Sequence, residues 1–139
     1  MADVPVAPAV ADGDTAEPVT RVLILADDMI WADRLARATR AAGGEPAALR
    51  SIAALDVALG DASTLIVDLT ARGYDGLDAI RRATDAGARV LAVGQHDDHD
   101  LRRQARAAGA ERVLAYRKLA EDGPATIAAW LARPRTDRR

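Results

Sequence analysis

The chain of 139 residues is long enough for one domain with its own hydrophobic core. It contains no cysteine, which excludes disulfides, thiolate metal sites and thiol catalysis. The net charge of −2 gives no general attraction to nucleic acid or anionic membranes, and no apolar run reaches the roughly 20 residues that a membrane span needs. We therefore expect a cytoplasmic protein with neither nucleic acid nor a membrane as its partner.

Composition divides the chain into a central domain and two tails. Residues 1–20 are rich in Ala, Pro, Asp and Gly and show no periodicity, which predicts a disordered N-terminal tail. Residues 133–139 form a short polar tail that contains Pro134. Residues 21–132 alternate apolar runs with helical patterns and are predicted to form a single domain.

The first half of this domain predicts two strands, each followed by a helix. A continuous apolar run of strand length is typical of a strand covered on both faces, and apolar residues three or four apart, with Arg between them, indicate a helix. The predicted elements are a strand at Val22–Leu25, a helix capped by Asp28 and stopped by Gly43-Gly44, a weak strand at Glu45–Leu49 and a helix at Ile52–Leu59 capped by Ser51.

The second half repeats the alternation three times. Strands are predicted at Thr64–Val67, Arg89–Val93 and Val113–Tyr116, and helices at Asp75–Ala86, Asp98–Ala108 and from Ala120 or Pro124 to Ala132. Strict alternation of strands and helices predicts an α/β fold with a parallel sheet covered on both faces. The expected architecture is flavodoxin-like, with five parallel strands in the order 2-1-3-4-5.

Acidic side chains follow two of these strands. Asp27 and Asp28 come after the first strand, and Asp68 closes the third. A sheet of this kind binds ligands at the carboxyl ends of its strands, where carboxylates from neighbouring strands repel one another. A hard cation such as Mg²⁺ relieves that repulsion and neutralises an incoming phosphoryl group. The pattern predicts an acidic pocket in which one Asp is a nucleophile.

Two segments resemble the receiver domain of two-component response regulators. Leu65–Ile80 is similar to the phosphoacceptor segment, because an apolar strand ends in Asp68 and a short loop leads to Gly73-Tyr-Asp-Gly76 and a helix. Val22–Asp28 resembles the first strand of that family with its acidic cluster. The resemblance covers roughly Arg21 to Leu131.

The resemblance implies specific roles. Asp68 would be the phosphoacceptor, and Asp27, Asp68 and the backbone carbonyl of Thr70 would hold Mg²⁺, with Asp28 as a further candidate ligand. The partner would be a sensor histidine kinase or another signalling protein, and the chain would not be an enzyme.

Several positions depart from the family pattern. Ala26 stands where the first acid is expected, Gly94 where a Ser or Thr ends the fourth strand, and Tyr116 where a Lys follows the fifth. Lys118 comes two residues later, and two further differences are Leu114 for an aromatic residue and Arg72 for a Pro. These auxiliary positions, Gly94, Tyr116 and Lys118, are typical of a degenerate receiver, or pseudo-receiver.

Two main hypotheses about function follow. The first is a stand-alone receiver-like signalling protein that docks to a partner, with phosphorylation at Asp68. The alternative is a phosphorylation-independent module for interaction or homodimerisation. A domain that binds a small ligand at the same strand ends is a third, weaker hypothesis.

Three other groups of residues have simpler explanations. The run from His96 to Asp100 has spacing that a metal site could use, but a solvated loop with a helix cap is the preferred interpretation. Arg102, Arg103 and Arg106 predict a solvated helix face or a docking surface. Trp31 and Trp130 fall in the first and last helices, where we expect packing or a dimer contact.

Overall fold

The computed structural model describes residues 19–60 and 63–134, so most of both predicted tails lies outside the described residues. Its centre is one sheet of five parallel strands in the order β2-β1-β3-β4-β5, which confirms the predicted flavodoxin-like topology. The strands are β1 (Arg21–Leu25), β2 (Glu45–Leu49), β3 (Thr64–Asp68), β4 (Arg89–Gly94) and β5 (Arg112–Ala115).

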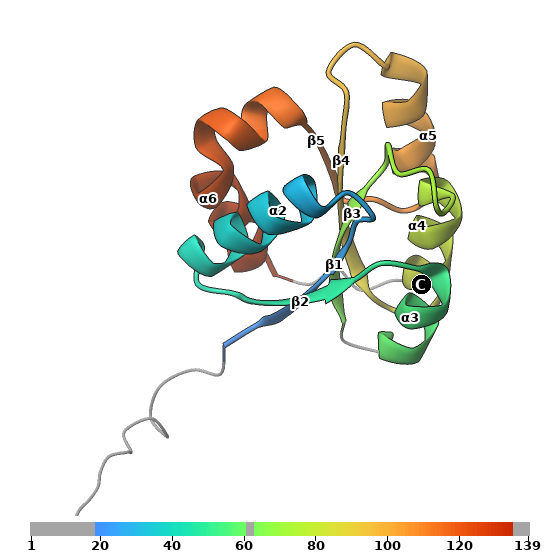
Figure 1. Ribbon diagram of the computed structural model, residues 1–139, viewed down its shortest axis with the longest axis horizontal. Helices are drawn as coiled ribbons and strands as arrows, with labels where there is room; N and C mark the ends of the chain where they lie inside the picture. The colour runs from blue at the N-terminus through green and yellow to red at the C-terminus, as the bar shows by residue number, and fades with distance from the viewer. Residues whose placement is uncertain (1–18, 61–62, 135–139) are drawn as a thin grey trace, which may run out of the picture.

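Helices cover both faces of the sheet (Figure 1). One face packs against α2 (Met29–Ala41) and α6 (Tyr116–Ala132). The other packs against α3 (Ile52–Ala58), α4 (Gly76–Asp85) and α5 (His99–Ala108). Successive side chains of a strand point to opposite faces, so Val22 and Ile24 pack toward α2 and α6, whereas Leu23 and Leu25 belong to the opposite core.

Side-chain caps fix the starts of four helices. The carboxylate of Asp28 accepts hydrogen bonds from the backbone N–H groups of Ile30 (2.8 Å) and Trp31 (3.2 Å) at the start of α2. Ser51, Asp75 and Asp98 accept equivalent bonds at the starts of α3, α4 and α5. Each cap satisfies backbone donors that have no partner within the helix, and such a bond stabilises the fold by about 1 kcal/mol.

The last strand is displaced by one residue from its prediction, and the predicted start of the last helix is wrong by at least four residues. The fifth strand ends at Ala115, and α6 begins at Tyr116 rather than at Ala120 or Pro124. Leu119 is buried in the core, and this burial favours a helical turn before Pro124. The backbone leaves helical geometry at Asp122 (φ −153°, ψ 28°), so α6 consists of two pieces joined by a kink. The predicted start at Pro124 corresponds to the second piece.

A buried arginine ties β4 to the end of α6. The guanidinium of Arg89 donates to Glu111 (3.1 Å), to the carbonyl of Arg133 (3.1 Å) and to the carbonyl of Trp130 (2.8 Å). The indole N–H of Trp130 donates to the same carboxylate oxygen of Glu111 (2.9 Å). This network satisfies a charge that would otherwise be costly to bury, and it holds Trp130 in the core.

Candidate functional site

One pocket at the carboxyl ends of β1 and β3 contains the acidic residues that the sequence singled out. It has a volume of about 300 Å³. Its lining residues are Asp27, Asp28, Trp31, Asp68, Thr70 and Arg72. The fold thus brings all the predicted ligand residues to a single pocket, and Arg72 adds a cation at the position where the resembling family has a Pro.

Asp68 is almost fully buried, with 1% of its surface exposed. Its Oδ1 accepts hydrogen bonds from the backbone N–H of Thr70 (3.0 Å) and from the Thr70 hydroxyl (3.0 Å). The hydroxyl of Tyr116 donates to the same oxygen. The two hydroxyl groups also contact each other. Short-range bonds from the following loop and one long-range bond from α6 therefore hold this carboxylate in place.

Tyr116 reaches Asp68 because α6 begins directly after β5. Its ring packs against the ring of Trp31, with 4.2 Å between centroids and 34° between planes. Burial raises the pKa of the Tyr116 phenol above its ordinary value, and the hydrogen bond to Asp68 raises it further. The phenol is therefore a neutral donor to Asp68 at physiological pH, at the position where a cationic Lys was expected.

Asp27 is held by the loop that follows β3. Its Oδ2 accepts a hydrogen bond from the backbone N–H of Gly73 at 2.7 Å. A Cβ atom on residue 73 would lie 2.8 Å from this oxygen, so any larger residue would require the Asp27 carboxylate to shift. The guanidinium of Arg50 donates to the backbone carbonyl of Asp27 (3.1 Å). The Gly73-x-Asp-Gly76 sequence thus has a direct structural role at the site.

Sequence reasoning did not find Tyr74. Its buried hydroxyl lies 2.9 Å from the carbonyl oxygen of Leu25 and 2.7 Å from that of Asp68, and it donates to one of them at a time. Burial raises the pKa of this phenol strongly, and the nearby charges of Asp68 and Asp27 add to the effect. Tyr74 therefore ties the ends of β1 and β3 together beneath the pocket. Its neighbours in the sequence, Gly73 and Asp75, gave no signal of this role.

The remaining predicted positions lie as follows. Asp28 lines the pocket, but its Oδ1 is used as the cap of α2. Gly94 ends β4, and the space beside it is filled by the Leu69 side chain, which would be 3.4 Å from a Cβ atom at residue 94. Lys118 is exposed, and its ammonium lies 3.4 Å from Asp122 within α6. Lys118 thus forms an ion pair within α6 and does not line the Asp68 pocket.

The donor chemistry of the pocket suits Mg²⁺, because three carboxylates line it. The placement does not suit the ion: in the described part of the chain, no three Asp, Glu, His or Cys side chains are arranged to hold a metal. One oxygen of each carboxylate already accepts hydrogen bonds: Oδ2 of Asp27 from Gly73, Oδ1 of Asp68 from Thr70 and Tyr116, and Oδ1 of Asp28 from the start of α2. The three carboxylates would therefore have to move closer together to hold a cation through their remaining oxygens.

The polar run after β4 is organised around a helix start. Asp98 accepts from the backbone N–H of Leu101 (3.0 Å), and Asp100 pairs with Arg103. His96 and His99 are both exposed. These contacts agree with the preferred interpretation of this segment as a solvated loop with a cap.

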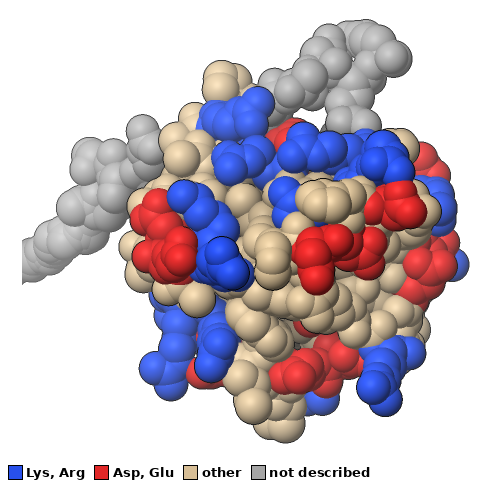
Figure 2. Space-filling model, turned by 90° about the horizontal axis from the view of Figure 1, so that it is seen from above, with Lys and Arg blue, Asp and Glu red and all other residues tan. Residues whose placement is uncertain are grey.

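The molecular surface seen from the carboxyl ends of the strands carries both signs of charge. Figure 2 shows basic and acidic side chains interspersed with uncharged surface on this face. Within residues 19–60 and 63–134, no helix is long and apolar enough to cross a membrane.

A doubly wound parallel sheet in this strand order is the flavodoxin-like architecture of receiver domains, and here it gathers carboxylates at its carboxyl edge. Solved structures of receiver domains have the same fold. The BeF3-activated receiver domain of DrrB, from Thermotoga maritima, superposes with a TM-score of 0.71 at 14% identity, over 84% of this chain and 100% of that chain.

Two further solved structures show the same fold. A putative response regulator from Chloroflexus aurantiacus is 25% identical to this chain and has a TM-score of 0.67. The match covers 84% of this chain and 100% of that chain. A response regulator from Burkholderia pseudomallei, solved with a phosphorylated aspartic acid, a calcium ion and citrate, is 22% identical over 81% of this chain and 73% of its own, with a TM-score of 0.60. No family model and no curated protein matches the sequence. The chain has the receiver-domain fold.

Proposed function

We propose that this chain is a receiver-like, non-enzymatic signalling module of the cytoplasm, which docks to a partner protein without needing a phosphoryl group on Asp68. The observation that carries the proposal is the hydrogen bond from the Tyr116 hydroxyl to Asp68 Oδ1. The protein thus supplies its own donor to the carboxylate on which a phosphoryl group would be carried.

The charge of that donor supports the proposal. A phosphoryl group brings a charge of about −1.5 to −2 and needs cationic or hydrogen-bonding partners. Tyr116 is neutral, Gly94 offers no hydroxyl, and Lys118 pairs with Asp122. Each missing charge-assisted hydrogen bond costs about 1.5–3 kcal/mol of stabilisation. Among the residues that line the pocket, Arg72 alone would offer a cation to an acyl phosphate at Asp68.

A second candidate function is phosphorylation at Asp68, and the shared pocket of Asp27, Asp28, Asp68 and Thr70 favours it. A carboxylate oxygen of Asp68 would attack the phosphorus atom of a phosphohistidine on a histidine kinase, or that of a small phosphodonor. The bond from phosphorus to the donor would break as the acyl phosphate forms. This candidate requires Tyr116 to leave Asp68, and the placement of the carboxylates requires a further rearrangement before Mg²⁺ could bind.

A comparison of four full-length proteins separates the two candidates. They are the wild-type chain, Asp68→Asn, the double variant Tyr116→Lys/Gly94→Ser and the triple variant that adds Asp68→Asn to it. Each is incubated with Mg²⁺ and acetyl phosphate, and in parallel with beryllofluoride. We expect no phosphoryl mass gain and no change in the amide NMR spectrum for the wild type. The double variant should gain both responses, and adding Asp68→Asn to it should abolish them. The Cβ atom of a Ser at residue 94 would lie 3.4 Å from the Leu69 side chain, an ordinary van der Waals contact.

Stoichiometric phosphorylation of wild-type Asp68 would contradict phosphate independence and support the second candidate. Docking itself is tested with a partner isolated on the wild-type chain. Its affinity for Asp68→Asn should equal its affinity for the wild type, because the partner is proposed to read the surface and not the phosphate. A loss of about tenfold or more, equivalent to about 1.4 kcal/mol, would overturn this part of the proposal.

A further inference from the structure

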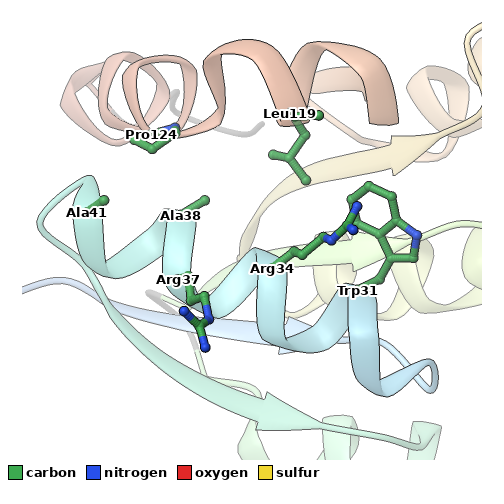
Figure 3. Close-up of a pocket in the computed structure, with 8 residues that line it drawn as sticks. Trp31, Arg34, Arg37, Ala38, Ala41, Leu119 and Pro124 are labelled. Atoms are coloured by element: carbon green, nitrogen blue, oxygen red, sulfur yellow. The ribbon is translucent and has the colours of Figure 1, made fainter.

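A groove between α2 and α6 lies next to the Asp68 pocket and shares Trp31 with it. It has a volume of about 560 Å³ and is mostly apolar. Its lining residues are Trp31, Arg34, Arg37, Ala38, Ala41, Leu119, Ala120 and Pro124. Figure 3 shows Leu119 and Pro124 of α6 facing the α2 helix, whose alanines leave the space between the helices open.

One side of the groove carries positive charge. The guanidinium of Arg34 lies over the Trp31 ring, 5.1 Å from its centroid, and contacts no carboxylate among the described residues. Arg37 is partly neutralised by Asp33 at 2.7 Å, in a pair that is largely exposed. The α6 side contributes Leu119, Ala120 and Pro124, none of which is charged. The groove therefore fits a segment that combines small apolar side chains with carboxylates.

Residues 2–17 of the chain have this composition. Val4 to Ala11 reads VPVAPAVA, and the segment contains the acids Asp3, Asp12, Asp14 and Glu17 with no Lys or Arg. Prolines at 5 and 8 disfavour a helix, so an extended segment is the form expected to enter the groove.

The point of attachment brings this segment to the groove. The carbonyl of Thr20 accepts a hydrogen bond from the backbone N–H of Glu45 (2.8 Å), just beyond the end of α2 where Ala41 lines the groove. Eighteen residues can extend about 60 Å, at about 3.3 Å each. The thirteen residues of α2 span only about 20 Å. The segment is thus long enough to run the whole length of the groove and reach Arg34.

We propose that residues 2–17 bind in the α2–α6 groove of the same chain, with their carboxylates against Arg34. Attachment to the same chain gives an effective concentration of roughly millimolar, so even weak contacts keep the groove occupied for much of the time. The bound segment covers Trp31, which also lines the Asp68 pocket. A partner that needs this face must displace the segment.

Paramagnetic relaxation in the full-length protein tests the proposal. Because the chain has no cysteine, Ala9→Cys allows a nitroxide to be attached at one position. We expect amide signals of Ala38, Ala41 and Ala120 to weaken at least about twofold relative to that of Ala107 in α5, since a millimolar affinity fills about half the grooves. Arg34→Glu should restore the signals. Arg81→Glu, the same charge change on the exposed surface of α4, should not.

Three results would overturn the proposal. The first is equal weakening on the α5 face and in the groove, and the second is weakening that persists in Arg34→Glu. The third is weakening that appears when spin-labelled, unenriched protein is mixed with unlabelled, ¹⁵N-enriched protein, because a second copy would then occupy the groove. Salt at roughly 1 M, where the Debye length is about 3 Å, should reduce the effect. No effect of salt would contradict the role of the carboxylates.

Discussion

The Tyr116 hydroxyl donates a hydrogen bond to Oδ1 of Asp68, which joins the first turn of α6 to the end of the central strand. The two residues are 48 positions apart in the sequence. The ring that carries this hydroxyl is itself held against Trp31. A site that resembles a phosphoacceptor is therefore closed by an aromatic side chain from the last helix.

Replacing Tyr116 by Phe should lower the free energy of unfolding by about 1 kcal/mol, because the half-buried Asp68–Tyr116 bond is lost while the contact with Trp31 is kept. Urea denaturation measures the change. Arg117→Ala, at the exposed neighbouring position, is the control and should leave stability unchanged. Equal stability of Tyr116→Phe and wild type would mean that the hydrogen bond contributes nothing to the folded state.

Stability should decline in alkaline solution because of Tyr74 and Tyr116. Both phenols have a pKa raised above the ordinary value of about 10 in the folded state, chiefly by burial. In the unfolded chain they ionise near that ordinary value. The stability contributed by the neutral phenols is therefore complete below pH of about 10 and is lost as the pH rises above it.

Urea midpoints measured across this range, together with tyrosinate absorbance of the folded protein, check the prediction. Tyr116→Phe should show a shallower decline than the wild type. Ionisation of both phenols near pH 10 with the fold intact would be incompatible with the buried positions described above.

Gly73→Ala should displace the Asp27 carboxylate and destabilise the protein by about 1 kcal/mol, because the added Cβ would meet Asp27 Oδ2 at 2.8 Å and the hydrogen bond from the Gly73 N–H would be lost. Gly60→Ala is the matched control, since the nearest atom there, Ser63 Oγ, is 3.8 Å away. Thermal unfolding of both variants gives the comparison, and chemical shifts around residue 27 report displacement of the carboxylate. If both variants behave alike, the close approach at Gly73 is not required.

Arg89→Met should cost about 3–5 kcal/mol, because the Glu111 carboxylate and the carbonyls of Trp130 and Arg133 lose their buried donor. The control is Arg103→Met, which removes an exposed partner of Asp100 and should change little. The two free energies of unfolding are compared by denaturation in urea. A small loss in Arg89→Met would show that the network is dispensable.

Much of the fold could be predicted because local signals agreed with one another. Apolar runs marked the strands, and Asp28, Ser51, Asp75 and Asp98 marked helix starts that the structure confirms to within one residue. The acidic pocket also followed from chain order, because Asp27 and Asp68 end neighbouring parallel strands.

The rest depended on contacts between distant parts of the chain. Tyr116 was expected to end a strand, and no local pattern indicated that its hydroxyl would meet Asp68. Tyr74 looked like an ordinary loop residue until the fold placed it between two strand ends. Pro124 suggested a helix start, whereas burial of Leu119 extended the helix backwards past it.

The kink at Asp122 divides α6 into two pieces with different contacts. Beyond it, the second piece is anchored by Trp130, which Arg89 and Glu111 hold in the core. Before it, the short piece carries Tyr116, on the Asp68 pocket, and Leu119, on the α2–α6 groove. Because the same short piece carries both residues, a substitution that shifts it would alter the Tyr116–Asp68 hydrogen bond and the wall of the groove together.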